Sequence, residues 1–222
     1  NCSYADDIID SVKDTQKAKS ITKDIDHILK EGGFTVKNWT ISGKEEQNHF
    51  QLYLDLAKQK VLGVQWKSES DSFCFVTLIN FSPKRRNVRD GPNLMIDQIP
   101  VGIPIGLTKR MILSQVNGIY DPLGLATPFT IRAKITMRKL FTDQKQLGWD
   151  DPIPTEYRCE WSHFFREMFD MESISFDRSI KPQGTIGKPT LVLFSDASED
   201  AYGTCAYTRW ELENGTFASR LF

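Results

Sequence analysis

Two adjacent carboxylates near the start of the chain are the first residues that could do chemistry. Asp6 and Asp7 follow Tyr4 and Ala5, and the apolar pair Ile8-Ile9 comes directly after them. This pattern predicts a hairpin with the carboxylates at its tip. Hard oxygen ligands suit Mg²⁺, and two-metal phosphoryl transfer needs such ligands on a rigid element. Asp-Asp is also ordinary turn chemistry, so the dipeptide alone leaves metal binding open.

A third carboxylate stands far along the chain. Asp196 comes just after the apolar run Leu191–Phe194, and a short turn then leads to a second apolar stretch that contains Tyr202 and Gly203. The pattern predicts an apolar strand that presents an Asp near its end. A solvated Asp at a strand end gives the same pattern, so this motif too leaves the function open.

The charged residues are segregated along the sequence although the net charge is only −1. Residues 108–147 carry seven basic and two acidic side chains, whereas residues 150–178 carry eight acidic and three basic ones. Such segregation can create a local field that the total charge does not report. The basic segment therefore predicts either a phosphate-binding surface or an ordinary solvated helix face.

Composition excludes several classes of protein. Hydrophobic residues make up 40% and charged residues 26% of the 222 residues, as in a folded globular chain. The apolar runs are too short for a transmembrane helix, so no membrane partner is expected. The four cysteines form no CxxC pair, which argues against a zinc site or a disulfide framework and favours a reducing, intracellular setting.

Periodicity and caps predict the elements that position these residues. The chain also ends inside a predicted β-meander, which suggests an incomplete domain. Helices are expected over 15–30, 108–119, 127–146 and 155–169; strands over 34–37, 61–66, 72–79, 190–194, 201–210 and 217–222; an irregular connector over 83–104; and a linker over 179–189.

The N-terminal part resembles the palm of a reverse transcriptase. The resemblance rests on the Tyr4–Asp7 hairpin, the amphipathic helix that follows, and Gly32-Gly33-Phe34 before a strand that carries Lys37. The segment 61–66 resembles the region that grips the primer end. Asn38-Trp39 departs from the family pattern, in which Lys more often precedes this Trp directly.

The middle of the chain is similar to a narrower group, the Pao/BEL family of LTR retrotransposon polyproteins. The stretches that carry this similarity are Leu107–Arg110, Ile119–Gly124, Ala133-Lys134 and Trp149–Asp151. Residues 190–222 are similar to the start of an RNase H domain, in which the first catalytic Asp sits on the first strand.

These resemblances imply an α+β fold in four parts. The end of a polymerase palm, with both hairpins, covers 1–82; a helical thumb and connection region covers 83–178; a linker covers 179–189; and the start of an RNase H-like sheet covers 190–222. Asp6, Asp7 and Asp196 are the implied catalytic, Mg²⁺-binding residues. The implied nucleic-acid contacts are Tyr4, Lys37, Trp66, Lys109, Arg110 and Lys134.

The implied function is RNA-directed DNA polymerase with RNase H activity in the intact polyprotein. The partners would be an RNA template, a DNA primer and their hybrid, in a cytoplasmic virus-like particle with a nuclear phase. We expect neither reaction from this chain alone, because it lacks a further palm carboxylate, a fingers region and the remaining RNase H carboxylates, and so needs the flanking parts of the polyprotein.

Two alternatives come from other classes of protein. The central region of this polyprotein family is commonly labelled a peptidase, and aspartic peptidases pair two carboxylates. Their usual Asp-Thr-Gly or Asp-Ser-Gly does not occur in this sequence. The other alternative is a non-catalytic remnant that only binds nucleic acid.

Overall fold

The computed structural model describes nine stretches of the chain and divides it into two compact units. The described residues are 3–4, 7–8, 10–12, 14–37, 39–42, 60–61, 64–85, 88–142 and 146–222. One unit is Asn1–Phe73 and the other is Cys74–Phe222. The domain boundaries expected from the sequence stay predictions. Among the described residues, no helix is long and apolar enough to cross a bilayer.

The N-terminal unit begins with the predicted hairpin. Strand β1 (Ser3–Tyr4) pairs antiparallel with β2 (Asp7–Ile8), and Tyr4 lies opposite Asp7. Helix α1 (Thr15–Glu31) follows, and its first turn is capped by Asp14, whose carboxylate accepts a hydrogen bond from the backbone N–H of Lys17 at 2.7 Å. The hairpin and the helix predicted from the sequence are both present.

Two strand predictions in this unit are wrong. Residues 34–37 form no strand, because the helix ends in a turn in which the Phe34 N–H donates to the Leu29 carbonyl at 2.9 Å. The expected single strand 61–66 is instead two strands, β3 (Lys60–Val61) and β4 (Val64–Lys67), which pair antiparallel with Val61 opposite Val64. Strand β5 (Ser72–Cys74) comes next and ends earlier than the predicted 72–79.

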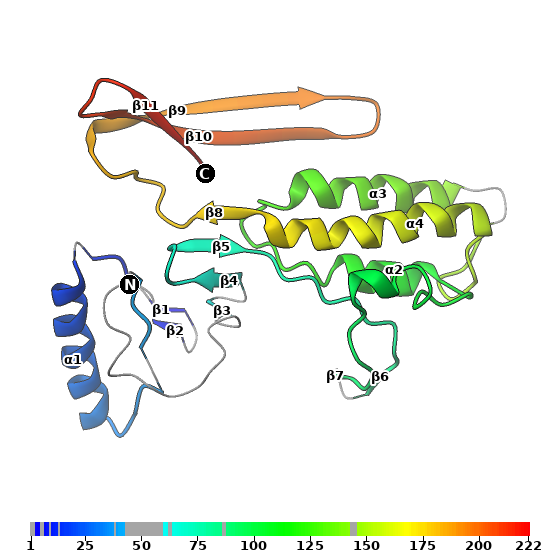
Figure 1. The fold of residues 1–222 in the computed structure, drawn as a ribbon, viewed down its shortest axis with the longest axis horizontal. Helices are drawn as coiled ribbons and strands as arrows, with labels where there is room; N and C mark the ends of the chain where they lie inside the picture. The colour runs from blue at the N-terminus through cyan, green and yellow to red at the C-terminus, as the bar shows by residue number, and fades with distance from the viewer. Residues whose placement is uncertain are drawn as a thin grey trace. The chain divides into compact units, whose positions relative to one another are not determined.

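The C-terminal unit is built around three helices (Figure 1). Helix α2 (Lys109–Val116) begins after the cap residue Thr108, α3 spans Thr127–Thr142, and α4 spans Thr155–Glu167 and continues into the 3₁₀ helix η4 (Met168–Ser173). Each helix buries the apolar stripe that its sequence predicts. The largest fully buried side chains include Ile79, Leu107, Ile112, Leu140, Trp161 and Phe165.

Helices α3 and α4 run antiparallel, and their contacts join the two oppositely charged segments. Arg132 pairs with Glu167 at 2.7 Å and Lys139 with Glu160 at 3.6 Å, so residues early in one helix meet residues late in the other. The Phe129 and Phe164 rings stack between them with centroids 4.6 Å apart. The basic segment thus pairs with two carboxylates of the acidic one, and the field expected from charge segregation is reduced.

Residues 75–80 lie alongside these helices without forming a strand, because side chains take the place of a partner strand. Gln115 receives the Asn80 N–H at 3.0 Å and donates to the Asn80 carbonyl at 2.9 Å. The Thr77 N–H donates to the Glu172 carboxylate at 2.8 Å. Gln115 and Asn80 are both buried. Backbone groups that a ladder would satisfy are therefore satisfied by α2 and η4.

The predicted connector holds more structure than expected. Strands β6 (Lys84–Arg85) and β7 (Val88–Arg89) form a short antiparallel pair, and η3 (Ile96–Gln98) is a single 3₁₀ turn. The loop after it packs closely, since a Cβ added at Gly102 would lie 2.6 Å from the Leu94 side chain. A larger residue at this position would therefore require the Leu94 side chain to move.

The C-terminal sheet has the order β11-β10-β9 and is antiparallel throughout. Its strands are β9 (Thr185–Ala197), β10 (Tyr202–Leu212) and β11 (Phe217–Leu221). The expected linker is wrong over its second half, because residues 185–189 belong to β9. Pro189 is tolerated there since β9 is an edge strand, and Gly187 takes the positive φ of 67° that the irregular pairing with β10 requires.

The segment before β9 is tied to the sheet and to the strand β8 (Ser175–Asp177). The Trp210 indole N–H donates to the Ile180 carbonyl at 2.8 Å, and Arg220 of β11 pairs with Asp177 at 2.8 Å. These bonds fix the point at which the chain enters the sheet.

Candidate functional site

Asp196 lies one residue before the end of β9, on an open part of the sheet. It pairs in register with Gly203 of β10 and is exposed. Gly203 has no side chain, and a Cβ placed there would meet nothing within 4 Å. One carboxylate oxygen of Asp196 accepts the Ala197 N–H at 2.9 Å. The other oxygen is therefore accessible to a ligand that approaches this face.

The turn that follows Asp196 is closed by a serine. The Ser198 hydroxyl accepts the N–H groups of Asp200 and Ala201, each at 3.2 Å, and donates to the Ala201 carbonyl at 3.1 Å. The Ser198 N–H donates to the same carbonyl at 2.8 Å. Local hydrogen bonds of this kind hold the four-residue turn in one conformation.

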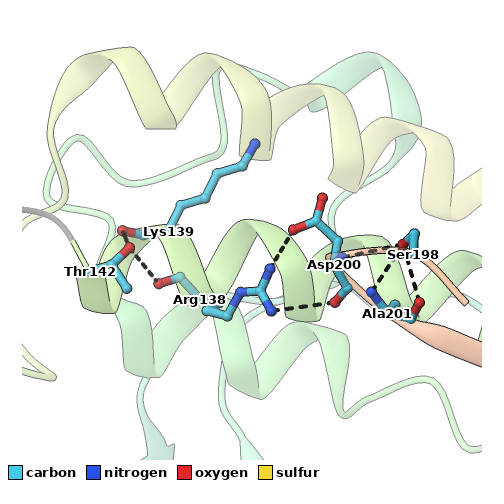
Figure 2. Close-up of polar contacts among 6 residues, drawn as sticks. All are labelled: Arg138, Lys139, Thr142, Ser198, Asp200 and Ala201. Atoms are coloured by element: carbon cyan, nitrogen blue, oxygen red, sulfur yellow. Dashed lines mark hydrogen bonds and ion pairs between the residues drawn. The ribbon is translucent and has the colours of Figure 1, made fainter.

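Arg138 of α3 binds this turn from outside, as Figure 2 shows. Its Nη2 pairs with the Asp200 carboxylate, and its Nη1 donates to the Asp200 carbonyl at 3.3 Å. Two bonds from one planar guanidinium fix direction as well as distance. Helix α3 therefore braces the turn four residues beyond Asp196, and Asp200 itself is occupied by the arginine.

Both faces of the sheet around Asp196 expose apolar side chains. Phe194, two residues earlier on the same face, is 59% exposed, and its ring contacts Tyr207 edge-on at 6.1 Å. On the opposite face Leu193 is 62% exposed. Apolar surface of this extent on both sides of a sheet is typical of a surface that another molecule or segment covers.

The described residues do not by themselves fit a Mg²⁺ site. Mg²⁺ takes octahedral oxygen coordination, usually with one or two carboxylates and several waters. Around Asp196 the neighbouring carboxylate of Asp200 is paired with Arg138. Within the described ranges, no group of three or more His, Cys, Asp or Glu side chains could hold a metal ion. Asp196 is thus a single accessible carboxylate.

The structure describes the predicted polymerase carboxylates only in part. Asp6 lies outside the described residues, and the backbone of Asp7 is described whereas its side chain is not. The same holds for Tyr4. Lys37 is exposed in the segment after α1. The hairpin backbone is confirmed, and the roles of these four residues stay predictions.

The other predicted nucleic-acid contacts have different surroundings. Trp66 donates its indole N–H to Asp71 at 3.0 Å, and Lys134 is exposed on α3. Lys109 is 2% exposed, with its ammonium 3.9 Å from the centre of the Phe141 ring. An ammonium buried in this way is not presented to a phosphate, so we do not propose Lys109 as a nucleic-acid contact.

Arg110 is exposed but already has an anionic partner. Its guanidinium donates to both carboxylate oxygens of Asp150, at 2.7 and 3.0 Å. This hydrogen bonding lowers the pKa of Asp150 below its ordinary value and raises the pKa of Arg110. Because the pKa of Asp150 is lowered in the folded chain, its ion pair stabilises the fold at pH values above the ordinary pKa of a carboxyl. That stabilisation is lost as the pH falls through the lowered pKa.

Sequence reasoning missed the contact between Arg138 and Asp200. Arg138 was only one of seven cations in a basic segment, and Asp200 was one residue of a polar turn. The two are 62 positions apart, so no local spacing relates them. The local signal that was available is the Ser198–Ala201 turn, which contains Asp200 and is closed by the Ser198 hydroxyl.

The comparisons with known proteins agree with this part of the fold. Residues 108–222, more than half of the chain, match the family model of the Pao retrotransposon-like RNaseH-like domain. The matched region includes α2, α3, α4 and the complete β9–β11 sheet. The description names an RNaseH-like domain and no peptidase. No curated protein and no solved structure matches the chain.

Proposed function

Since the chain belongs to the family of Pao retrotransposon-like RNaseH-like domains, we propose that it serves RNA-directed DNA synthesis within a retrotransposon polyprotein. Its β9–β11 sheet then meets the RNA–DNA hybrid, and Asp196 is one of the carboxylates required to hydrolyse the RNA strand. The proposal places this work inside the cell, with an RNA template and a DNA primer as partners.

The exposed position of Asp196 is the observation that carries this proposal. The carboxylate stands near the end of an apolar strand, lies opposite Gly203, which has no side chain, and is followed two residues later by a turn that Arg138 braces. A bulky phosphodiester backbone can approach a carboxylate only where neighbouring side chains leave room. A braced turn also holds the carboxylate in place before substrate arrives, which a reacting group requires.

The polymerase half of the proposal rests on the N-terminal hairpin. Strands β1 and β2 have two residues each and pair antiparallel, with Tyr4 opposite Asp7. Such a hairpin suits carboxylates that must be held on a rigid element. We propose Asp6 and Asp7 as the carboxylates for nucleotide addition, distinct from Asp196.

The two activities are tested by a double dissociation. In polyprotein products that contain this chain, we expect Asp196→Asn to lower hydrolysis of the RNA strand of an end-labelled hybrid by more than about a hundredfold, because a carboxylate of the site supplies several kcal/mol. Primer extension by the same variant should be unchanged. Asp6→Asn should have the opposite effect, with extension lost and hydrolysis retained.

The matched control is Asp170→Asn, which removes an exposed carboxylate from η4, away from the sheet. Both activities should survive it. Hydrolysis that is equal in the Asp196→Asn and Asp170→Asn variants would overturn the role of Asp196. Extension that persists in Asp6→Asn would overturn the polymerase assignment.

A further inference from the structure

A groove in the C-terminal unit lies between α4 and the loop after η3. It has a volume of about 380 Å³, and its walls include Ile99, Pro100 and Ile103 of the loop together with Arg158, Ser162, His163 and Arg166 of α4. It is distant in sequence from both carboxylate motifs, and the proposed function assigns no role to it.

The groove carries positive charge that the surrounding protein does not cancel. Arg166 is exposed and has no ion pair within the part of the chain that the structure describes. Two of the three acidic residues of α4 have ion-pair partners: Glu160 pairs with Lys139, and Glu167 pairs with Arg132 and with His163, which lines the groove. Neither of these two carboxylates pairs with Arg158 or Arg166, the two arginines of the groove wall.

Arg158 joins the helix to the loop and is fixed in direction. Its Nε donates to the Pro104 carbonyl at 3.3 Å and its Nη2 to the Ile103 carbonyl at 2.8 Å. Neither bond involves the remaining amino group, Nη1. The guanidinium is therefore held at the groove by neutral partners and keeps its full positive charge.

The loop side of the groove is apolar. Ile99, Pro100 and Ile103 line it, and Ile99 and Ile103 are only 3% and 2% exposed, whereas Val101 and Ile105 of the same loop, which are not part of the lining, are each 90% exposed. Apolar side chains beside arginines suit a ligand that alternates charged and apolar groups. A nucleic-acid strand has this character, since its sugars and bases lie between the phosphates, and aliphatic side chains are known to contact base steps.

We infer that this groove binds the phosphodiester backbone of a nucleic-acid strand. Arg158 and Arg166 are eight residues apart on one helix, which corresponds to about 12 Å along its axis and so to roughly three or four nucleotide steps of a duplex strand. An acidic protein segment is the other ligand that arginines attract. The strand is favoured because the chain belongs to an RNaseH-like family, and in this respect the inference rests on the proposed function.

The test is equilibrium binding of a fluorescent RNA–DNA hybrid by the whole chain, measured by anisotropy between about 25 and 200 mM salt. We expect Arg166→Glu to weaken binding about tenfold at low salt and Arg166→Ala about threefold, each with a shallower dependence on log salt concentration by about one unit, because a phosphate contact is lost.

The matched control is Lys23→Glu, which reverses an exposed charge on α1 that lines no part of the groove and belongs to no part of the β9–β11 sheet. If Arg166→Glu weakens binding no more than Lys23→Glu does, the groove assignment is overturned although the chain still binds the hybrid. Full displacement of the hybrid by an equal concentration of a glutamate-rich peptide would overturn it in favour of a protein ligand. The carboxylate variants test the proposed function separately, because they report hydrolysis and extension rather than affinity at Arg166.

Discussion

Trp161→Ala is expected to destabilise the C-terminal unit by about 4 kcal/mol, because removing a fully buried Trp loses both its transfer free energy and its packing. The Trp161 side chain is 0% exposed, and its ring contacts Phe164 edge-on at 5.6 Å and Phe165 at 6.0 Å. A loss of this size is a large part of the total stability of a domain. Thermal unfolding followed by circular dichroism should show a midpoint lower by roughly 8–16 °C.

Trp149→Ala is the matched control for this substitution. Trp149 is 43% exposed and contacts Phe141 edge-on at 5.3 Å, so its removal should cost about 1 kcal/mol. Trp161→Phe adds a second comparison. The Trp161 indole N–H is buried without a hydrogen-bond partner in the described part of the chain, and phenylalanine removes that unpaired donor while it keeps a ring. Equal stability of the two alanine variants would contradict this description of the core.

Gln115→Ala is expected to cost about 2–5 kcal/mol, because it leaves two buried backbone groups without partners. The Gln115 amide receives the Asn80 N–H at 3.0 Å and donates to the Asn80 carbonyl at 2.9 Å, so it replaces a partner strand at this point. Both residues are buried, and water cannot substitute for the lost bonds. The measurements are denaturant unfolding and the hydrogen-exchange protection of the Asn80 amide, which should fall sharply.

Gln98→Ala provides the control for Gln115. Gln98 also receives a backbone N–H, that of Met95 at 2.8 Å, but it is exposed, so water replaces the lost bond. Its substitution should cost less than about 1 kcal/mol. A Gln115→Ala variant as stable as Gln98→Ala would show that residues 75–80 do not depend on this side chain.

The helices could be predicted from the sequence because their signals are local. Thr108 caps α2 at the start of the helix predicted over 108–119. The apolar stripe of α4, which its periodicity predicts, carries Trp161 into the core. Caps and 3.6-residue periodicity act within one or two turns. The hairpin of Tyr4 and Asp7 was predictable for the same reason.

The remaining features depend on residues far apart in the chain. The extension of β9 over 185–189 follows from the length of β10, which pairs Leu212 with Thr185. Gln115 replaces a strand partner 35 positions away, and Arg138 reaches a turn 62 positions away. The charge segregation was read correctly along the sequence, but its effect on the surface was overestimated, because Arg132 and Lys139 are paired with acidic residues of α4.

The central claim is that the end of β9 with Asp196, and the turn that follows it, meet an RNA–DNA hybrid. Hydrogen exchange of the whole chain with and without the hybrid tests this claim most directly. We predict that the hybrid slows amide exchange in residues 196–204, and that DNA duplex of the same sequence slows it less. Binding of the hybrid that leaves exchange in residues 196–204 unchanged would contradict the account, as would the absence of any hybrid binding at low salt.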